Sequence, residues 1–144
     1  MRIPVLAATI IAGITTVSAQ QLAFPEAAGW GRYAKGARAS SVPTVYHVTN
    51  LNDSGAGSLR DAVSQSNRIV VFDVSGVINI KSRMTFKSNL YIAGQTAPGE
   101  GITVYGNGVS FSGANNIICR YLRVRMGRGG DSGKDCAGIA NGTN

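Results

Sequence analysis

The segment at residues 128–135 holds the side chains of this sequence that are best suited to chemistry. It reads Arg-Gly-Gly-Asp-Ser-Gly-Lys-Asp, so Asp131 and Asp135 lie four residues apart in a glycine-rich loop. Carboxylate oxygens are preferred ligands of calcium, which takes about six to eight oxygen atoms. The two aspartates can supply only part of such a shell, and the loop lacks the spacing of an EF-hand. From spacing alone, a solvated turn is the more common explanation.

Residues 121–126, just before this loop, alternate in character. Successive side chains of a strand point to opposite faces of its sheet. The alternation therefore predicts a strand whose inner face is apolar and whose outer face is basic. The inner set is Leu122, Val124 and Met126, and the outer set is Tyr121, Arg123 and Arg125.

Other candidates for catalysis are weaker. His47 is the only histidine and lies within a strand pattern, so a structural role is favoured over a catalytic one. Two cysteines and one histidine are too few for a convincing zinc site. The sequence has no Gly-x-Ser-x-Gly motif, which disfavours a serine hydrolase. It also lacks clustered carboxylates on one strand, so hydrolysis by a paired acid and base is not supported.

The elements that must position these residues are short. A strand is expected at 45–49, and a turn-rich loop at 52–57 precedes a helix expected at 58–65. The Ser58 side chain can cap this helix, and the Asp61 side chain can bond back to the Ser58 amide, which would make a weak capping box. After Asn67 only short apolar runs remain, without an amphipathic helix between them, which argues against alternating strands and helices.

These apolar runs form an internal repeat. A spacing of 25 residues separates Val77 from Ile102, Met84 from Val109 and Phe86 from Phe111, and 26 residues separate Ile92 from Ile118. Asparagine precedes an apolar run at Asn67, Asn89 and Asn116, where a stacked corner could bond to the coils above and below. A repeat of this size without a helix is typical of a β-solenoid. An antiparallel sandwich also gives short strands, but the repeat favours the solenoid.

Residues 1–19 have the composition of a secretory signal peptide. Arg2 precedes an apolar stretch, and small residues lead to a cleavage site after Ala19. The apolar stretch is shorter than the roughly 20 residues that a membrane-spanning helix needs. The mature chain, 20–144, is therefore predicted to be soluble, secreted and extracellular.

Charge and cysteine content leave several alternatives open. The formal net charge is +7, or +6 once Arg2 is removed, which suits a polyanionic partner but also serves solubility. Nucleic acid and membrane are disfavoured as partners. Cys119 and Cys136 could pair, stay as two buried thiols, or bond a cysteine in another segment. Asn52 and Asn141 begin candidate glycosylation motifs.

Several stretches taken together resemble the secreted pectate lyases of the fungal and bacterial type. The resemblance covers nearly the whole mature chain, in order, although no single stretch is specific. The stretches lie at 23–25, 31–34, 48–55, 57–63, 69–76, 92–99, 102–108 and 130–135.

The resemblance implies a right-handed, single-stranded parallel β-helix, all-β apart from a short N-terminal helix. It implies calcium-dependent β-elimination of α-1,4-linked polygalacturonate, in which an arginine takes the proton. By position, Asp135 becomes the best calcium ligand and Asp131 a weaker companion, which reverses the interpretation from spacing alone. Arg123, Arg125 and Lys134 border the expected substrate groove without an assigned role.

The sequence also departs from the family pattern. Glu26, Ala28 and Trp30 stand where the family usually has Gly, Glu and Phe, and Cys136 stands where a small residue is usual. The family domain is more than twice as long as this chain, and the arginine base and further calcium carboxylates are expected downstream of Asn144. The chain is accordingly expected to be the N-terminal part of a pectate lyase, a monomer if complete. The alternative is an inactive truncated product or a pectate-binding remnant.

Overall fold

The computed structural model describes residues 20–142. The predicted signal peptide at 1–19 lies outside the described residues. Within the described part of the chain, no helix is long and apolar enough to cross a membrane.

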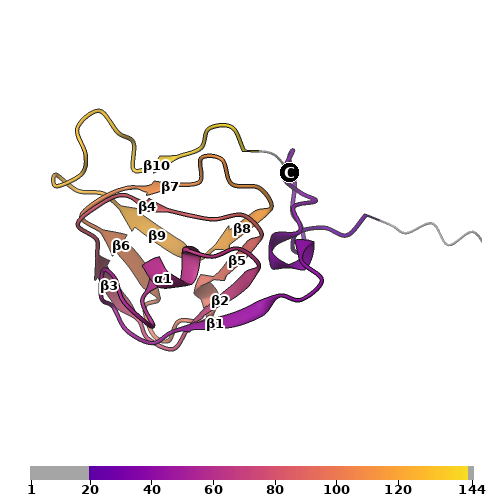
Figure 1. Ribbon diagram of the computed structural model, residues 1–144, viewed down its shortest axis with the longest axis horizontal. Coiled ribbons are helices and arrows are strands. Elements are labelled where there is room, and N and C mark those ends of the chain that lie inside the picture. The colour runs from indigo at the N-terminus through magenta and orange to yellow at the C-terminus, as the bar shows by residue number, and fades with distance from the viewer. Residues whose placement is uncertain (1–19, 143–144) are drawn as a thin grey trace, which may run out of the picture.

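Three parallel sheets enclose one core, and the chain visits them in turn (Figure 1). Sheet A has the spatial order β1 (Thr44–Val48), β2 (Arg68–Phe72), β5 (Leu90–Ala93) and β8 (Ile117–Arg120). Sheet B has β3 (Gly76–Asn79), β6 (Ile102–Tyr105) and β9 (Leu122–Arg125). Sheet C has β4 (Met84–Thr85), β7 (Val109–Ser110) and β10 (Ala137–Gly138). The three coils that begin at β2, β5 and β8 thus each contribute one strand to each sheet, whereas β1 is followed by α1 and pairs only within sheet A. This arrangement confirms the predicted parallel β-helix.

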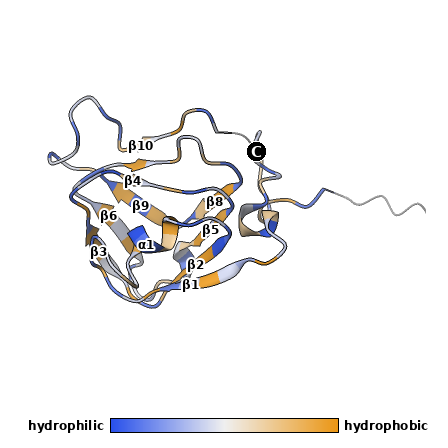
Figure 2. Cartoon of the chain, in the orientation of Figure 1, coloured by the Kyte–Doolittle hydropathy of each residue, from blue (hydrophilic) through white to orange (hydrophobic). Residues whose placement is uncertain are grey.

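The core consists of the inward side chains of all three sheets. Hydrophobic residues recur along the strands and in α1 (Figure 2). Ile78, Ile102 and Val104 from sheet B are fully buried, as are Val70 and Leu90 from sheet A. Between consecutive coils, Phe86 and Phe111 stack with their ring centroids 4.6 Å apart. Inward residues of one coil therefore cover inward residues of the next, as the repeat predicted.

The predicted register was wrong at two positions. Val77 does not pair with Ile102, because Gly76 does, and Val77 pairs with Thr103 instead. Val77 consequently points outward and is 56% exposed. Side chains alternate between faces, so a slip of one residue reverses which of them are buried.

The same slip affected the pairing of β5 with β8. The spacing paired Ile92 with Ile118, but Ile92 pairs with Cys119, and Tyr91 pairs with Ile118. Tyr91 and Ile118 therefore lie on the outer face of sheet A. The predicted pair Met84 and Val109 is confirmed.

Helix α1 (Leu59–Val63) is shorter than the predicted 58–65 and lies within the outline of the three sheets (Figure 1). Its apolar residues Leu59, Ala62 and Val63 are all fully buried, so the helix closes one end of the core. Ser58 caps it by accepting from the Asp61 amide at 3.2 Å, as predicted.

The reciprocal half of the capping box is absent. The Asp61 carboxylate instead accepts a hydrogen bond from the Tyr46 hydroxyl at 2.5 Å. This hydrogen bond is the largest of the effects that raise the pKa of Tyr46. The bond joins α1 to β1, so the aspartate ties two elements together rather than completing a local motif.

The predicted asparagine corners are present. Asn67, Asn89 and Asn116 all have φ between 52° and 65°, a left-handed conformation that asparagine tolerates. Asn89 donates from its side-chain amide to the Asn67 side-chain oxygen at 2.9 Å. At Asn116 the side-chain oxygen accepts from the Lys35 backbone amide at 3.4 Å.

Residues 20–40, which we call the N-terminal arm, pack against the outer face of sheet A. Within the arm, the 3₁₀ helix η1 (Gly36–Ala39) contacts β5 and β8. The Arg120 guanidinium of β8 lies 4.4 Å from the centroid of the Phe24 ring. A second 3₁₀ helix, η2 (Gly94–Thr96), follows β5 and leads toward β6.

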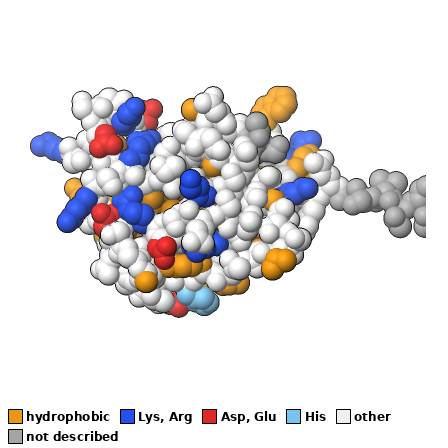
Figure 3. Space-filling model, in the orientation of Figure 1, with side chains coloured by type: hydrophobic (Ala, Val, Ile, Leu, Met, Phe, Trp, Pro, Cys, Tyr) orange, Lys and Arg blue, Asp and Glu red, His pale blue; other side chains and the backbone are white. Residues whose placement is uncertain are grey.

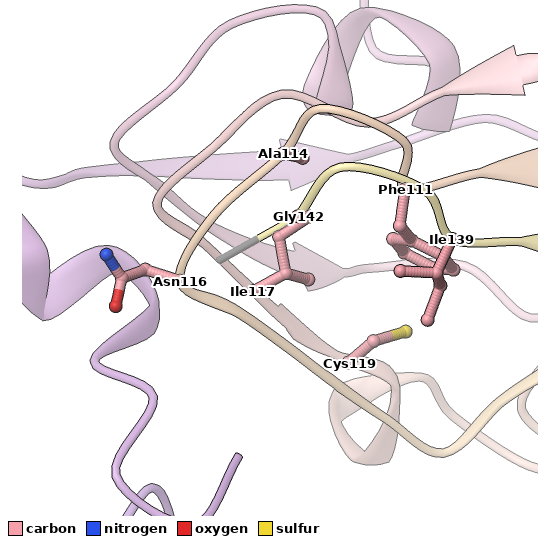
Figure 4. Close-up of a pocket in the computed structure, with 7 residues that line it drawn as sticks. All are labelled: Phe111, Ala114, Asn116, Ile117, Cys119, Ile139 and Gly142. Carbon is pink, nitrogen blue, oxygen red and sulfur yellow. The ribbon is translucent and has the colours of Figure 1, made fainter. Parts of the chain in front are cut away.

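The other end of the core carries β8, β9 and β10, each the outer strand of its sheet among the described residues. A hollow of about 400 Å³ lies there. Phe111, Ile117, Cys119 and Ile139 line it, and Figure 4 shows Asn116 directed away from them. This end therefore presents apolar side chains, in contrast to the end that α1 closes.

Candidate functional site

The outer face of sheet B carries the arginine row. Register places Val77, Thr103 and Arg123 in one column across β3, β6 and β9, and Asn79, Tyr105 and Arg125 in the next. Leu122 and Val124 point inward between the arginines, so the predicted alternation is confirmed. Tyr121 is the single residue between β8 and β9, with φ of 57°.

Arg123 is held in place by its neighbours. Its Nε donates to the Thr103 hydroxyl at 3.1 Å, and a terminal nitrogen donates to the Glu100 carbonyl oxygen. A hollow of about 430 Å³ lies beside Arg123 and continues to Tyr121 and η2. The guanidinium is thus fixed at the rim of a depression on the outer face.

The loop that follows β9 contains Asp131 and Asp135, at the side of the molecule where acidic and basic atoms gather (Figure 3). The Asp131 carboxylate accepts from the Asn107 side-chain amide at 2.9 Å. Asn107 is only 1% exposed, and its oxygen accepts from the Gly108 amide at 2.7 Å. A buried asparagine between β6 and β7 therefore orients Asp131.

Asp135 is held by its backbone rather than by its carboxylate. Arg83 donates to the Asp135 carbonyl oxygen at 2.9 Å. A Cβ at Gly108 would come within 2.8 Å of the same oxygen, so only glycine allows this close approach. The side chain of Asp135 is exposed, and no hydrogen bond or ion pair to it is found among residues 20–142. Its oxygens are therefore available to a ligand.

The two aspartates fit the chemistry of a calcium site without completing one. Both side chains are exposed carboxylates on one loop, and Asp135 has free oxygens. Calcium needs about six to eight oxygen ligands. No group of three or more His, Cys, Asp or Glu side chains that could hold a metal ion occurs within the described residues. The described part of the chain thus offers a partial ligand set.

The remaining candidate residues lie elsewhere. His47, on the outer face of sheet A, contacts Asp73 at 2.9 Å, away from the loop with the aspartates. Cys119 and Cys136 are both free thiols, and the Cys136 sulfur donates to the Val124 carbonyl at 3.3 Å. Cys119 is exposed at the open end of the core, but partial desolvation of its thiol raises the pKa to about 11, so this thiol stays protonated near neutral pH.

The glycosylation candidates are both exposed. Asn52 lies in the loop before α1, and Asn141 has φ of 54° near the end of the described chain. Thr143, which completes the second motif, lies outside the described residues. Glycosylation at either position stays a prediction.

The sequence patterns missed three residues of this site. Thr103 and Tyr105 share the outer face with the arginines, and the alternation of residues 102–105 could have identified both. Asn107 gave no signal, because its contact with Asp131 crosses 24 residues of sequence.

Comparison with known proteins addresses the resemblance. No family model matches the chain. It is 63% identical over 123 residues to the probable pectate lyase C of Emericella nidulans, covering 85% of this chain and 28% of that protein. The probable pectate lyase C of Aspergillus flavus is 61% identical over 123 residues, covering 85% and 29%. The probable pectate lyase C of Aspergillus terreus is 54% identical over 143 residues, covering 99% and 33%.

The chain therefore spans about a third or less of the length of these relatives. Identity above 50% over most of the chain is far more than short motifs could give. Together with the parallel β-helix, these similarities confirm that the chain resembles the pectate lyases, and in particular the proteins named probable pectate lyase C.

Proposed function

We propose that this chain forms coils of a secreted, calcium-dependent pectate lyase that cleaves polygalacturonate by β-elimination. The observation that carries the proposal is the outer face of sheet B, where Arg123 and Arg125 stand beside the loop with Asp131 and Asp135. One oriented guanidinium, that of Arg123, and one carboxylate without a hydrogen bond, that of Asp135, thus lie on consecutive segments of a chain similar to pectate lyases, which supports the proposal.

The arginines suit a polyuronate substrate. Each galacturonate unit carries a carboxylate, and a planar guanidinium binds a carboxylate through two parallel hydrogen bonds. Arg123 is already oriented by Thr103, which reduces the entropy lost on binding. The formal net charge of +7 favours encounter with a polyanion.

Asp135, with Asp131, would hold calcium on the loop that follows β9. When bound, calcium acts as a Lewis acid that neutralises the uronate carboxylate and makes the neighbouring C5 proton more acidic. Asn107 orients the Asp131 carboxylate, and Arg83 anchors the loop at the Asp135 carbonyl. In this proposal the aspartates hold the cation, Asn107 and Arg83 hold the loop, and none of these residues takes the proton.

The proton acceptor is not assigned to this chain. The family uses an arginine as base, and no residue of this sequence matches it. An arginine base needs surroundings that disfavour its charge, because the ordinary pKa of arginine lies far above neutral pH. We propose that this base, and further calcium ligands, lie in a region that the relatives contain and this chain does not cover.

Binding is the direct test. The chain should be retarded in native gels that contain polygalacturonate, more strongly with calcium than with a chelator. Asp135→Asn should remove the calcium-dependent part of this retardation, because the amide is a weaker ligand of the same size. Asp73→Asn, which removes a carboxylate from sheet A, is the matched control and should leave it unchanged. Equal retardation of both variants would contradict the assignment of Asp135.

Cleavage is measured by the ultraviolet absorbance of the unsaturated product. The chain alone should give no signal. A chimera that continues with the downstream sequence of the Emericella nidulans relative should give a calcium-dependent signal. A signal from the chain alone would show that a base exists within these 144 residues and would overturn the assignment above.

A second candidate is a pectate-binding module without catalysis. The partial ligand set favours it, since within residues 20–142 no larger cluster of metal-ligating side chains is found. An inactive chimera, together with calcium-dependent binding by the chain, would support the binding module over the lyase.

A further inference from the structure

The N-terminal arm presents an aromatic side chain in an unusual state. Trp30 is 101% exposed, so no described residue covers its indole. A single exposed apolar residue needs no explanation by itself. Here, however, a hollow of about 470 Å³ is lined by Trp30 together with Gly29, Arg32 and Tyr33. An exposed ring therefore forms one wall of a depression that also contains a cation.

The cation beside Trp30 is free to bind an anion. The guanidinium carbon of Arg32 lies over the Tyr33 ring, 4.7 Å from its centroid. Within the described residues, its side-chain nitrogens have no carboxylate and no carbonyl as a partner. A guanidinium stacked on a ring keeps its in-plane N–H groups available for a carboxylate.

The backbone holds these side chains on a fixed turn. The Ala23 amide donates to the Arg32 carbonyl at 2.8 Å, and the Arg32 amide donates to the Gly29 carbonyl at 3.3 Å. Gly29 has φ of 79°, a conformation that glycine adopts without strain. A site on a closed turn loses less conformational entropy on binding than one on an open loop.

The charge of the arm identifies the kind of occupant. Residues 20–40 contain three basic residues, Arg32, Lys35 and Arg38, and one acidic residue, Glu26. An aromatic ring can pack against the apolar C–H face of a sugar ring, while a guanidinium pairs with a carboxylate. A uronate unit carries both features, whereas a neutral sugar lacks the carboxylate and a simple anion lacks the apolar face.

We propose that Trp30 and Arg32 form a binding subsite for a uronate unit of an anionic polysaccharide, separate from the outer face of sheet B. This inference rests on the proposed function for the identity of the polymer. The arm packs on sheet A, so the subsite would hold the chain to polymer without occupying the groove beside Arg123.

The chain contains one tryptophan, so its intrinsic fluorescence reports on position 30 alone. Titration with oligogalacturonate should shift the emission to shorter wavelength and protect the indole from quenching by acrylamide, which is uncharged. A neutral oligogalactan of equal length should cause neither change. Arg32→Gln should weaken oligogalacturonate binding by about tenfold, which corresponds to about 1.4 kcal/mol.

Gel retardation separates this inference from the proposed function. Trp30→Ala should lower retardation by polygalacturonate with and without calcium, and Trp30→Phe should retain most of it, because the ring remains. Val42→Ala, at another exposed apolar position, is the matched control. Arg123→Gln should leave the fluorescence response intact.

If the fluorescence is unchanged in a chain that polygalacturonate still retards, the proposed subsite at Trp30 and Arg32 is wrong. The proposed binding site beside Arg123 would not be contradicted by this result. A fluorescence response without calcium-dependent retardation would support the subsite and contradict the proposed groove. The absence of both would contradict both proposals.

Discussion

Among individual residues, Arg60 makes the most extensive polar contacts described. It binds the Asp53 carboxylate at 2.6 Å and also donates to the backbone carbonyls of Ser82 and Arg83. Burial by itself would raise the pKa of Asp53. Hydrogen bonds from Arg60 and from the Lys81 amide, with the charges of both residues, outweigh burial and lower this pKa. The pair joins the loop before α1 to the corner between β3 and β4.

We predict that Asp53→Asn lowers the free energy of unfolding by about 1–3 kcal/mol at neutral pH, as expected when a charged hydrogen bond is lost. A carboxylate with a lowered pKa stabilises the fold above its ordinary pKa of 3.8, and this contribution is lost as pH falls through the folded value. The difference between parent and variant should therefore shrink below about pH 4. Urea denaturation at pH 7 and pH 3 measures it.

Asp73→Asn provides the comparison. Asp73 pairs with His47, but both side chains are about half exposed, and exposed ion pairs contribute about 0–1 kcal/mol. If Asp73→Asn lowered the free energy of unfolding as much as Asp53→Asn, burial would not be what makes the Asp53–Arg60 pair the stronger one.

Sequence reasoning at this scale succeeded where a contact was local. Ser58 was expected to cap the helix that follows it, and it does so by accepting from the amide three residues on. The Asp61 carboxylate was expected to bind within the same turn, but it accepts a hydrogen bond from Tyr46, 15 residues earlier. Asn107 and Asp131 are likewise joined across 24 residues. Such partners become visible only when the coils are stacked.

At the scale of elements, β3 offers a direct test of register. Ile78 is fully buried, whereas its neighbour Val77 is 56% exposed. We predict that Ile78→Ala destabilises the protein by about 2–4 kcal/mol. Val77→Ala should change stability by less than about 0.5 kcal/mol. Urea midpoints of the two variants measure the difference, and a reversal of their order would restore the register expected from the 25-residue spacing.

The asparagine corner can be divided into backbone and side-chain contributions. Asn89 has φ of 58° and donates to Asn67. Asn89→Gly keeps the backbone conformation and loses the hydrogen bond, so we expect a loss of about 1 kcal/mol. Asn89→Ala also places an ordinary side chain in the left-handed region, which adds about 1–2 kcal/mol. Thermal denaturation of both variants tests this order. Equal melting temperatures would show that backbone conformation contributes nothing at this corner.

The pattern of elements was largely predictable, and their register was not. Short β-branched runs and the absence of amphipathic helices indicated a solenoid, and three parallel sheets confirm it. Corner lengths vary, however. Tyr121 alone joins β8 to β9, whereas residues 94–101 join β5 to β6. Paired residues are 22 apart between β2 and β5 but 27 apart between β5 and β8. The 26-residue spacing from Ile92 to Ile118 therefore missed the register by one residue and assigned the wrong face.

At the scale of the whole molecule, the two ends of the core differ. Helix α1 closes one end, and the other presents Ile139, which is 77% exposed, near Phe111 and Ile117. Unpaired strand edges and apolar surface favour association with other chains. We predict that this chain is poorly soluble or self-associates in a concentration-dependent manner, as measured by sedimentation velocity.

Ile139→Lys should reduce this association, because a charge at the open end opposes burial there. Val42→Lys, at a position that is 75% exposed and precedes β1, should not reduce it. A monomeric parent chain with a cooperative melt would contradict the prediction.

The position of the N-terminal arm has a consequence for the order in which the molecule is assembled. Coils pair with neighbours at moderate separations, such as Met84 with Val109, so each coil can form soon after synthesis on the coil before it. The arm is different, because Lys35 binds Asn116 across 81 residues. The arm can contact β5 once that strand is made, but its docking cannot be completed until Asn116 and β8 have been made. Translation speed and chaperone access thus act on the arm for longer than on any coil that follows it.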